Sequence, residues 1–289
     1  MLKKYFGEIM LFIVTLIGAS GWFLSKYSMQ ELPPMGFLGL RFSLAFILFL
    51  PLSYSQLRSL DKLQLVRAGT VGVAYTVNIV LWLLGLINSV HLGEGAFLVS
   101  LAMLIAPLLS WVLFKHKPQK LFWISLPIAV AGLYLLSTEK SAFHFSLGNF
   151  IFLCSSLFAA LYFVLNSHFA RNIPVLSLTT IQLGVVGVCC GIYSCAVENW
   201  PSTISAGVWW WFGGSVVLAT NIRVLLQTIG QKNCNIGSAA IIMVLEPVWT
   251  LFLSVLILGE VLTGQKLLGC LLILSALVIY RLQNLLLRK

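Results

Sequence analysis

Charged residues are scarce in this chain. Only 9% of its 289 residues are charged and only eight are Asp or Glu, whereas 60% are hydrophobic. The mean hydropathy is +0.99, which excludes a soluble domain because so much apolar surface could not be covered. Apolar stretches of about 20 residues recur instead, and each could cross a hydrocarbon core of about 30 Å as a helix. The composition predicts an all-α polytopic membrane protein.

The chain also lacks the usual motifs of metal and nucleotide chemistry. Its six cysteines show no CxxC spacing and lie mostly in apolar runs, which is typical of small packing residues. Its four histidines are scattered near predicted helix ends, which argues against a metal site. A phosphate loop with a Walker lysine is missing from the sequence. We predict no cofactor, no metal and no ATP-driven pumping.

Ten apolar segments are separated by short breaker sequences such as "ELPPMG", "KHKPQK", "ARNIPV" and "ENWPST". Short connections leave no room for a soluble domain between the segments. The predicted transmembrane helices are 7–26, 35–53, 67–88, 92–114, 120–137, 147–168, 176–196, 206–228, 236–258 and 264–285.

The basic residues suggest an orientation in the membrane. An even number of helices places both termini on one side, and 13 of the 18 basic residues then share that side. These are Lys3, Lys4, Arg58, Lys62, Arg67, Lys115, Lys117, Lys120, Arg171, Lys232, Arg281, Arg288 and Lys289. Lys26, Lys140 and Lys266 fall on the other side, and Arg41 and Arg223 fall within helices. We predict cytoplasmic termini in the inner (plasma) membrane. The positive charge then needs no nucleic acid as a partner.

The two halves of the chain resemble each other. At an offset of 141 residues, Gly7 matches Gly148, Trp22 matches Phe163, Pro33 matches Pro174, and Arg41 matches Gln182. We therefore predict two five-helix units, residues 1–140 and 141–289. An odd number of helices per unit makes the repeat inverted, as in many secondary transporters. The alternative is chance similarity between apolar helices.

Three blocks resemble the EamA-like family of the drug/metabolite transporter superfamily. They are "GWFLSKYSMQELPPMGFLGLRF", "GEGAFLVSLAMLIAPLLSW" with the later "KHKP" and "AGLYLL", and "SAAIIMVLEPVWTLFLSVLILGEVLTGQKLLG". The last block is the most specific, and the resemblance covers essentially the whole chain. Many family members carry a second Gly-Glu pair in the first repeat, where this chain has "FKHKPQK". The resemblance implies ten helices around a central cavity, alternating access and a small-molecule solute.

Polar and aromatic side chains within helices indicate where such a cavity would be lined, because polar groups in a membrane usually face the bundle interior. Tyr75, Asn78 and Trp82 share one face of their helix at i, i+3 and i+7. The predicted solute-binding residues are Trp22, Tyr75, Asn78, Trp82, Ser100, Tyr162, Asn166, Asn221, Arg223, Gln227, Glu246 and Trp249. The alternative is that these groups only bridge packed helices.

Glu246 stands beside Pro247 in the apolar run "MVLEPVWTLFLSVLILGE". An unpaired charge at mid-helix costs at least about 2.5–3.5 kcal/mol, so a partner is expected. We predict that Arg223 is this partner, because the two helices should be antiparallel neighbours and the depths of the two residues should differ by only about 7 Å. Pro247 should kink the helix there. Glu260 is a weaker candidate than Glu246 for a functional carboxylate, because solvent can reach it.

The functional prediction is a secondary transporter that exports amino acids or related zwitterionic or amphipathic solutes. Aromatic faces suit amphipathic solutes, and Arg41 and Arg223 suit a carboxylate or a phosphate. Alternatives are an exchanger for S-adenosylmethionine, nucleotide sugars or drugs, an intramembrane enzyme, and a receptor or assembly subunit. Proton coupling, sodium coupling, exchange and facilitated diffusion stay open. So does the choice between monomer and homodimer, for which the Gly187–Gly191 spacing offers a close-packing surface.

Overall fold

The computed structural model describes residues 5–88, 92–137, 146–259 and 263–286. These residues are almost entirely helical, and no strand occurs among them. The elements are α1 (Phe6–Ser28), α2 (Pro34–Arg58), α3 (Lys62–Ile87), α4 (Leu92–Phe114), α5 (Phe122–Ser137), α6 (Leu147–Phe169), α7 (Val175–Val197), α8 (Ala206–Val216), the π-helix η2 (Val217–Ile222), α9 (Arg223–Asn233), α10 (Ile236–Met243), α11 (Glu246–Leu258) and α12 (Gly264–Leu286).

The helices have the length and composition of membrane spans. Within the described residues, seven helical stretches are long and apolar enough to cross a membrane. Three further apolar helices are shorter, namely Leu98–Phe114, Phe122–Leu135 and Gly264–Tyr280. The all-helical, multi-pass membrane class predicted from the sequence is confirmed.

Two of the predicted helices were too short at one end. The second helix runs five residues past its predicted end to Arg58, and Pro51 lies inside it. The third begins at Lys62 because Asp61 forms a capping box with Gln64, in which each side chain accepts from the other residue's backbone N–H. Both extensions lie beyond the apolar stretch, where hydropathy gives no boundary signal.

Two predicted continuous helices are irregular. The segment predicted as 206–228 continues to Asn233 and changes to π-helix between Val217 and Ile222. The segment predicted as 236–258 breaks at Val244 and Leu245, so α10 and α11 are separate helices. Pro247 has no N–H to donate to the carbonyl four residues earlier, which explains the break.

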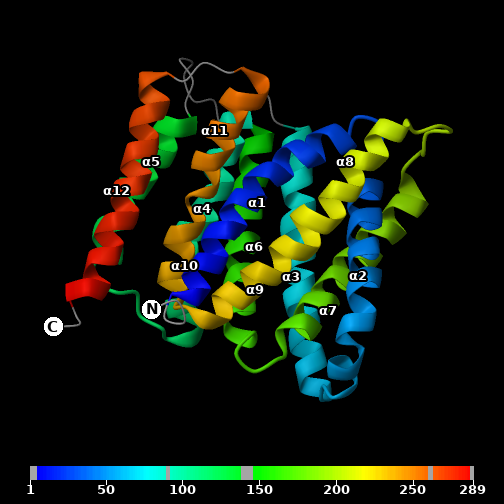
Figure 1. Ribbon diagram of the computed structural model, residues 1–289, viewed down its shortest axis with the longest axis horizontal. Coiled ribbons are helices and arrows are strands. Elements are labelled where there is room, and N and C mark those ends of the chain that lie inside the picture. Colours follow the sequence, from blue (N-terminus) through cyan, green and yellow to red (C-terminus); the bar gives the residue numbers. More distant parts are fainter. Residues whose placement is uncertain (1–4, 89–91, 138–145, 260–262, 287–289) are drawn as a thin grey trace.

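The helices pack in pairs that relate the two halves of the chain. In Figure 1, α2 lies against α7 at one side of the bundle, and α5 lies against α12 at the other. Likewise α3 packs on α6, while α1 packs on α8, η2 and α9. The Gly187 spacing serves the α2–α7 contact, because a Cβ on Gly187 would lie 2.6 Å from the Ser43 backbone nitrogen. This close-packing surface is therefore used inside the chain.

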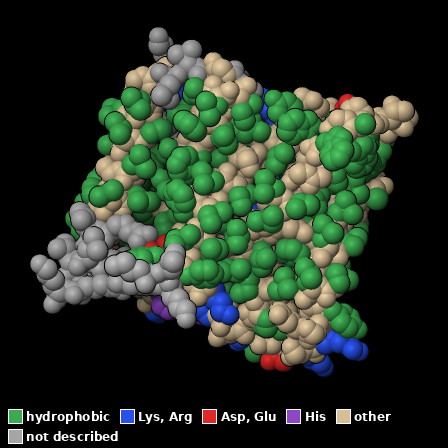
Figure 2. Space-filling model, in the orientation of Figure 1, with side chains coloured by type: hydrophobic (Ala, Val, Ile, Leu, Met, Phe, Trp, Pro, Cys, Tyr) green, Lys and Arg blue, Asp and Glu red, His purple; other side chains and the backbone are tan. Residues whose placement is uncertain are grey.

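The outer surface separates by polarity. Figure 2 shows apolar side chains across the middle of the visible face and Lys and Arg side chains mostly along its lower edge. The α2–α3 and α6–α7 connections lie at this lower end in Figure 1, where α1 also begins and α12 ends. Exposed Ile47, Leu52, Val188, Ile192 and Leu256 belong to the apolar surface, as expected for helices in contact with lipid.

Candidate functional site

The predicted ion pair is present between α9 and α11. Arg223 Nη2 donates to Glu246 Oε2 at 2.8 Å. The two side chains keep 26% and 18% of their exposure, so both remain partly accessible. An ion pair within the membrane-spanning part of a helix bundle avoids the cost of leaving either charge alone.

Both charges stand where regular helix is interrupted. Arg223 is the first residue of α9, directly after the π-helical segment, and Glu246 is the first residue of α11. Partial positive charge from the unpaired N–H groups of a helix N-terminus favours a carboxylate there. The break that Pro247 causes therefore gives Glu246 a second stabilising influence besides Arg223.

Gly18 of α1 provides the space for the Glu246 carboxylate. A Cβ at Gly18 would lie 2.6 Å from both Glu246 Cδ and Oε2. Such a distance is too short for real contacts, and the atoms met are the flexible end of a side chain. A larger residue at position 18 would therefore displace the carboxylate from Arg223 rather than break up the backbone packing.

A second arginine lies close to this pair. Arg41 of α2 donates to Thr220 Oγ1, to Ser25 Oγ at 2.9 Å and to the Ala219 carbonyl at 3.0 Å. Its guanidinium also lies 5.5 Å from the centre of the Phe37 ring. No carboxylate in the described ranges forms an ion pair with Arg41. The charges of Arg41, Arg223 and Glu246 therefore leave one net positive charge.

Aromatic side chains adjoin these charges. Tyr75 and Tyr162 stack with ring centres 4.4 Å apart, and Tyr75 also meets Phe42 edge-on. Both tyrosines lie within electrostatic range of Arg223. Trp22 and Trp82 form a second pair, edge to face at 5.0 Å, and both are only partly buried. The structure thus brings Tyr75, Tyr162, Arg223 and Glu246 together, with the tryptophan pair formed by α1 and α3.

Other predicted site residues are involved in helix packing. Asn78 accepts from Ser155 Oγ at 3.0 Å through its side chain. Asn166 is fully buried and joins Gln182, Thr228 and Gln231 in a polar network. Direct contact between solute and Asn166 would require this network to open.

The remaining predicted residues are less closely connected. Asn221 and Gln227 are buried, and no hydrogen-bond donor reaches Asn221 Oδ1. Trp249 meets Phe12 edge-on at 5.8 Å, and its indole N–H is buried without an acceptor. Ser100 lies partly buried in α4. Glu260 lies outside the described residues.

Sequence reasoning left two residues out of the predicted binding set. Arg41 was considered, together with Arg223, as suited to a carboxylate or a phosphate but was not placed in that set, although its position within a helix was a signal because intramembrane charges are rare. Gly18 gave no such signal, since its contact with Glu246 joins residues 228 positions apart. Within the described residues, no group of three or more His, Cys, Asp or Glu is placed to hold a metal ion.

Comparison with known proteins places these features in context. The model of the EamA-like transporter family matches residues 5–138 and again residues 146–282. An uncharacterized transporter of Archaeoglobus fulgidus is 26% identical over 284 residues, covering 97% of this chain and 87% of its own length. Another from the same organism is 26% identical over 193 residues, which cover 67% of this chain and 68% of its own. A solved crystal structure aligns with 99% of this chain and 100% of its own at a TM-score of 0.83, with 16% identity.

Proposed function

Because the chain belongs to the EamA-like transporter family, we propose that it is a secondary transporter of a small zwitterionic solute, acting by alternating access. The solute class is that of amino acids and related metabolites, and the proposed direction is export. The polypeptide acts as a carrier and performs no chemical reaction on the solute.

The excess positive charge inside the bundle carries this proposal. Arg41 has no carboxylate partner in the described ranges, so it can receive the carboxylate of a solute. A guanidinium matches a carboxylate or phosphate geometrically through two parallel hydrogen bonds. The ammonium group of the same solute can compete with Arg223 for Glu246. The half-buried Trp22 and Trp82 rings then offer a surface for the solute's apolar part.

Alternating access would use the relation between the two halves. We propose ten crossings in two inverted repeats, residues 1–140 and 141–289, with cytoplasmic termini in the inner membrane. The paired packing of α3 on α6 and of α1 on α8 to α9 supports the repeat. In this mechanism the Arg223–Glu246 pair opens when the cavity changes sides, and solute or a proton takes the place of Arg223. Reporter fusions at Lys140 and Lys289 test the orientation, since only the Lys289 fusion should be cytoplasmic.

A second candidate is an exchanger for an organic phosphate such as a nucleotide sugar, because Arg41 would accept phosphate as well as carboxylate. A phosphorylated solute without an ammonium group does not need an acidic partner such as Glu246. Transport by a Glu246→Gln variant therefore separates the two candidates, since a zwitterion should need Glu246 and a phosphorylated solute should not.

The direct experiment is counterflow in liposomes that contain the purified protein. Labelled amino acids should exchange saturably, and analogues whose carboxylate is replaced by an amide should compete at least about tenfold less well, because a hydrogen bond between charged groups is lost. Equal competition by the amides would contradict recognition through Arg41. Absence of flux for every zwitterion, with flux of phosphorylated compounds, would favour the second candidate.

The Gly18–Glu246 contact offers a second test of the same site. Gly18→Ala should move the carboxylate away from Arg223 and lower transport, while the folded amount stays nearly constant. Gly213→Ala is the matched control, because a Cβ there meets no atom within 4 Å. Equal transport by both variants would show that the ion pair is not part of the transport cycle.

A further inference from the structure

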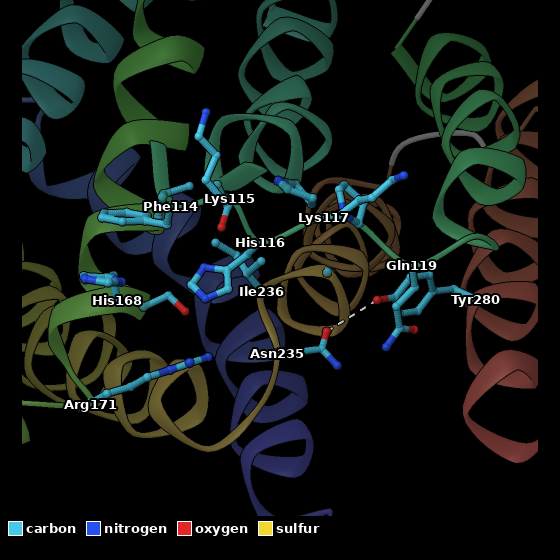
Figure 3. Close-up of a pocket in the computed structure, with 16 residues that line it drawn as sticks. Phe114, Lys115, His116, Lys117, Gln119, His168, Arg171, Asn235, Ile236 and Tyr280 are labelled. Carbon is cyan, nitrogen blue, oxygen red and sulfur yellow. Dashed lines mark hydrogen bonds between the residues drawn. The ribbon is translucent and has the colours of Figure 1, made fainter. Parts of the chain in front are cut away.

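A pocket lies at the basic end of the bundle, away from the Arg223–Glu246 pair. It has a volume of about 380 Å³ and is formed by the end of α4, the α4–α5 connection, the end of α6, the start of α10 and part of α12. Figure 3 shows Arg171 reaching toward its centre, with His116 and Asn235 opposite. The pocket therefore joins residues from both halves of the chain.

The lining of this pocket is positively charged. Lys115, Lys117 and Arg171 contribute three cations, and His116 and His168 contribute two imidazoles. None of the lining residues is Asp or Glu, and none of the three cations forms an ion pair within the described ranges. Glu8 acts electrostatically on the Tyr280 hydroxyl but does not line the pocket. An anion would therefore find several donors and no acidic side chain in the lining.

Packing holds one of the two imidazoles that line the pocket. The His168 ring stacks on Phe114 with centres 3.8 Å apart and planes 5° from parallel, as the parallel rings in Figure 3 show. The His116 ring lies 6.5 Å from that of His168. Gln119 Oε1 is buried in the pocket without a hydrogen-bond partner, so this oxygen can accept from a ligand hydroxyl. A phosphate ester supplies both acceptor oxygens and hydroxyl donors for such a set.

The backbone at Lys115 adds an independent indication. Lys115 has φ of +58°, a left-handed conformation that costs a non-glycine residue about 1–2 kcal/mol. Glycine is the usual residue at such a helix C-terminus. This turn folds the following residues, His116 to Gln119, over the pocket. A lysine at this position adds positive charge at the pocket despite the conformational cost.

We propose that this pocket binds a phosphate group at the basic side of the membrane. The phosphate belongs either to the headgroup of an anionic phospholipid or to a soluble phosphate compound. Arg171 is the main ligand, because a guanidinium can bind two phosphate oxygens at once. The lysines raise the local positive potential, and Gln119 Oε1 accepts from a hydroxyl group of the ligand. This site is separate from the proposed transport site.

The test measures binding to the intact protein in uncharged detergent by calorimetry. One arm titrates inorganic phosphate, and the other titrates short-chain phosphatidylglycerol against short-chain phosphatidylcholine. Arg171→Gln should weaken the phosphate-bearing ligand about tenfold, whereas Lys120→Gln should change binding less than twofold. Lys120 belongs to the same connection but does not line the pocket, so it is the matched control.

The two arms identify the source of the phosphate. Preference for phosphatidylglycerol over both phosphatidylcholine and inorganic phosphate assigns a lipid headgroup, while binding of inorganic phosphate assigns a soluble ligand. Lys115→Gly should weaken binding without lowering the thermal unfolding temperature, because glycine tolerates the left-handed turn. Equal losses in Arg171→Gln and Lys120→Gln, or no binding in either arm, would overturn the proposal. Transport is not the readout, so failure here leaves the proposed function unaffected.

Discussion

Arg41 and Gln182 occupy equivalent positions in the two halves of the chain, and each donates a hydrogen bond to the preceding helix. Arg41 Nη1 donates to Ser25 at 2.9 Å, and Gln182 Nε2 donates to Asn166 at 2.7 Å. The two donors are 141 residues apart in the sequence, and the two acceptors are also 141 residues apart. The same helix–helix contact is thus made once by a cation and once by a neutral amide.

The difference between these contacts shows where the symmetry of the halves ends. Gln182 is fully buried and belongs to a network of amides and the Thr228 hydroxyl, whereas Arg41 is partly exposed and brings a charge without an ion-pair partner in the described ranges. An amide is sufficient to hold the helices together, as Gln182 does. The charge of Arg41 therefore exceeds what packing requires, which supports a role toward an anionic solute.

Introducing a positive charge at position 182, in the second half, should have the largest effect on stability. Gln182→Arg would bury a cation beside the Asn166 amide, with no ion-pair partner in the described ranges, at a cost of about 2.5–3.5 kcal/mol. The folded amount and the thermal unfolding temperature in detergent should both fall. Gln182→Met controls for side-chain size, and a Gln182→Arg protein as stable as that control would contradict the comparison.

Removing the charge from the first half should affect transport more than folding. Arg41→Gln can still donate to Ser25, so the fold should survive, while counterflow of a zwitterion should drop about tenfold. Arg41→Lys should recover only part of the rate, because an ammonium cannot bind a carboxylate through two parallel bonds. Normal counterflow by Arg41→Gln would make this arginine a packing residue like Gln182.

The aromatic pairs provide a smaller test. Trp82→Ala removes an edge-to-face contact with Trp22 worth about 0.5–1.5 kcal/mol, so transport should fall between about twofold and tenfold. Asn78→Ala should also reduce it, with the folded amount nearly unchanged. Trp211→Ala is the control, since Trp211 stacks on Tyr27 at 4.9 Å and belongs to a different aromatic pair. If Trp82→Ala and Asn78→Ala transport normally, this face of α3 serves packing alone.

The smallest expected difference lies in the connections between helices. Ser205 donates its backbone N–H and hydroxyl to Glu31 at 2.6 and 2.8 Å, while the equivalent residues Gln64 and Asn172 form an uncharged hydrogen bond at 3.1 Å. The backbone N–H of Ser205, and then its hydroxyl, lower the pKa of the Glu31 carboxyl below 4.5. A lowered pKa means that this contact is stabilising above pH 4.5 and weakens as the pH falls below it.

Hydrogen exchange can measure this effect. The protection factor of the Ser205 amide should fall on acidification below pH 4.5, whereas the Asn172 amide, which donates to the uncharged Phe169 carbonyl at 3.0 Å, should keep its own. Glu31→Gln should remove the pH dependence. Unchanged protection of Ser205 at low pH would mean that the carboxylate charge contributes nothing to this contact.

Several features could be predicted because they depend on local sequence. Runs of apolar residues located the helices, and the family resemblance, confirmed by the match to both halves, rested on short motifs. The Arg223–Glu246 pair followed from two charges at similar depth on consecutive helices. The irregular segment at Val217–Ile222 could not be predicted, because its residues carry no breaker and the π-helix depends on neighbouring helices.

The sequence by itself determined that this protein is a helical membrane protein, where its helices lie and which two charges pair. Only the tertiary structure decided that Arg41 meets Thr220, that Gly18 faces Glu246, and that Arg171 and His116 share a pocket. The reason is that lipid and bundle interior are both apolar, so a membrane helix does not mark its packed face as a soluble helix does. Which faces meet is then fixed by close packing and polar contacts between distant residues.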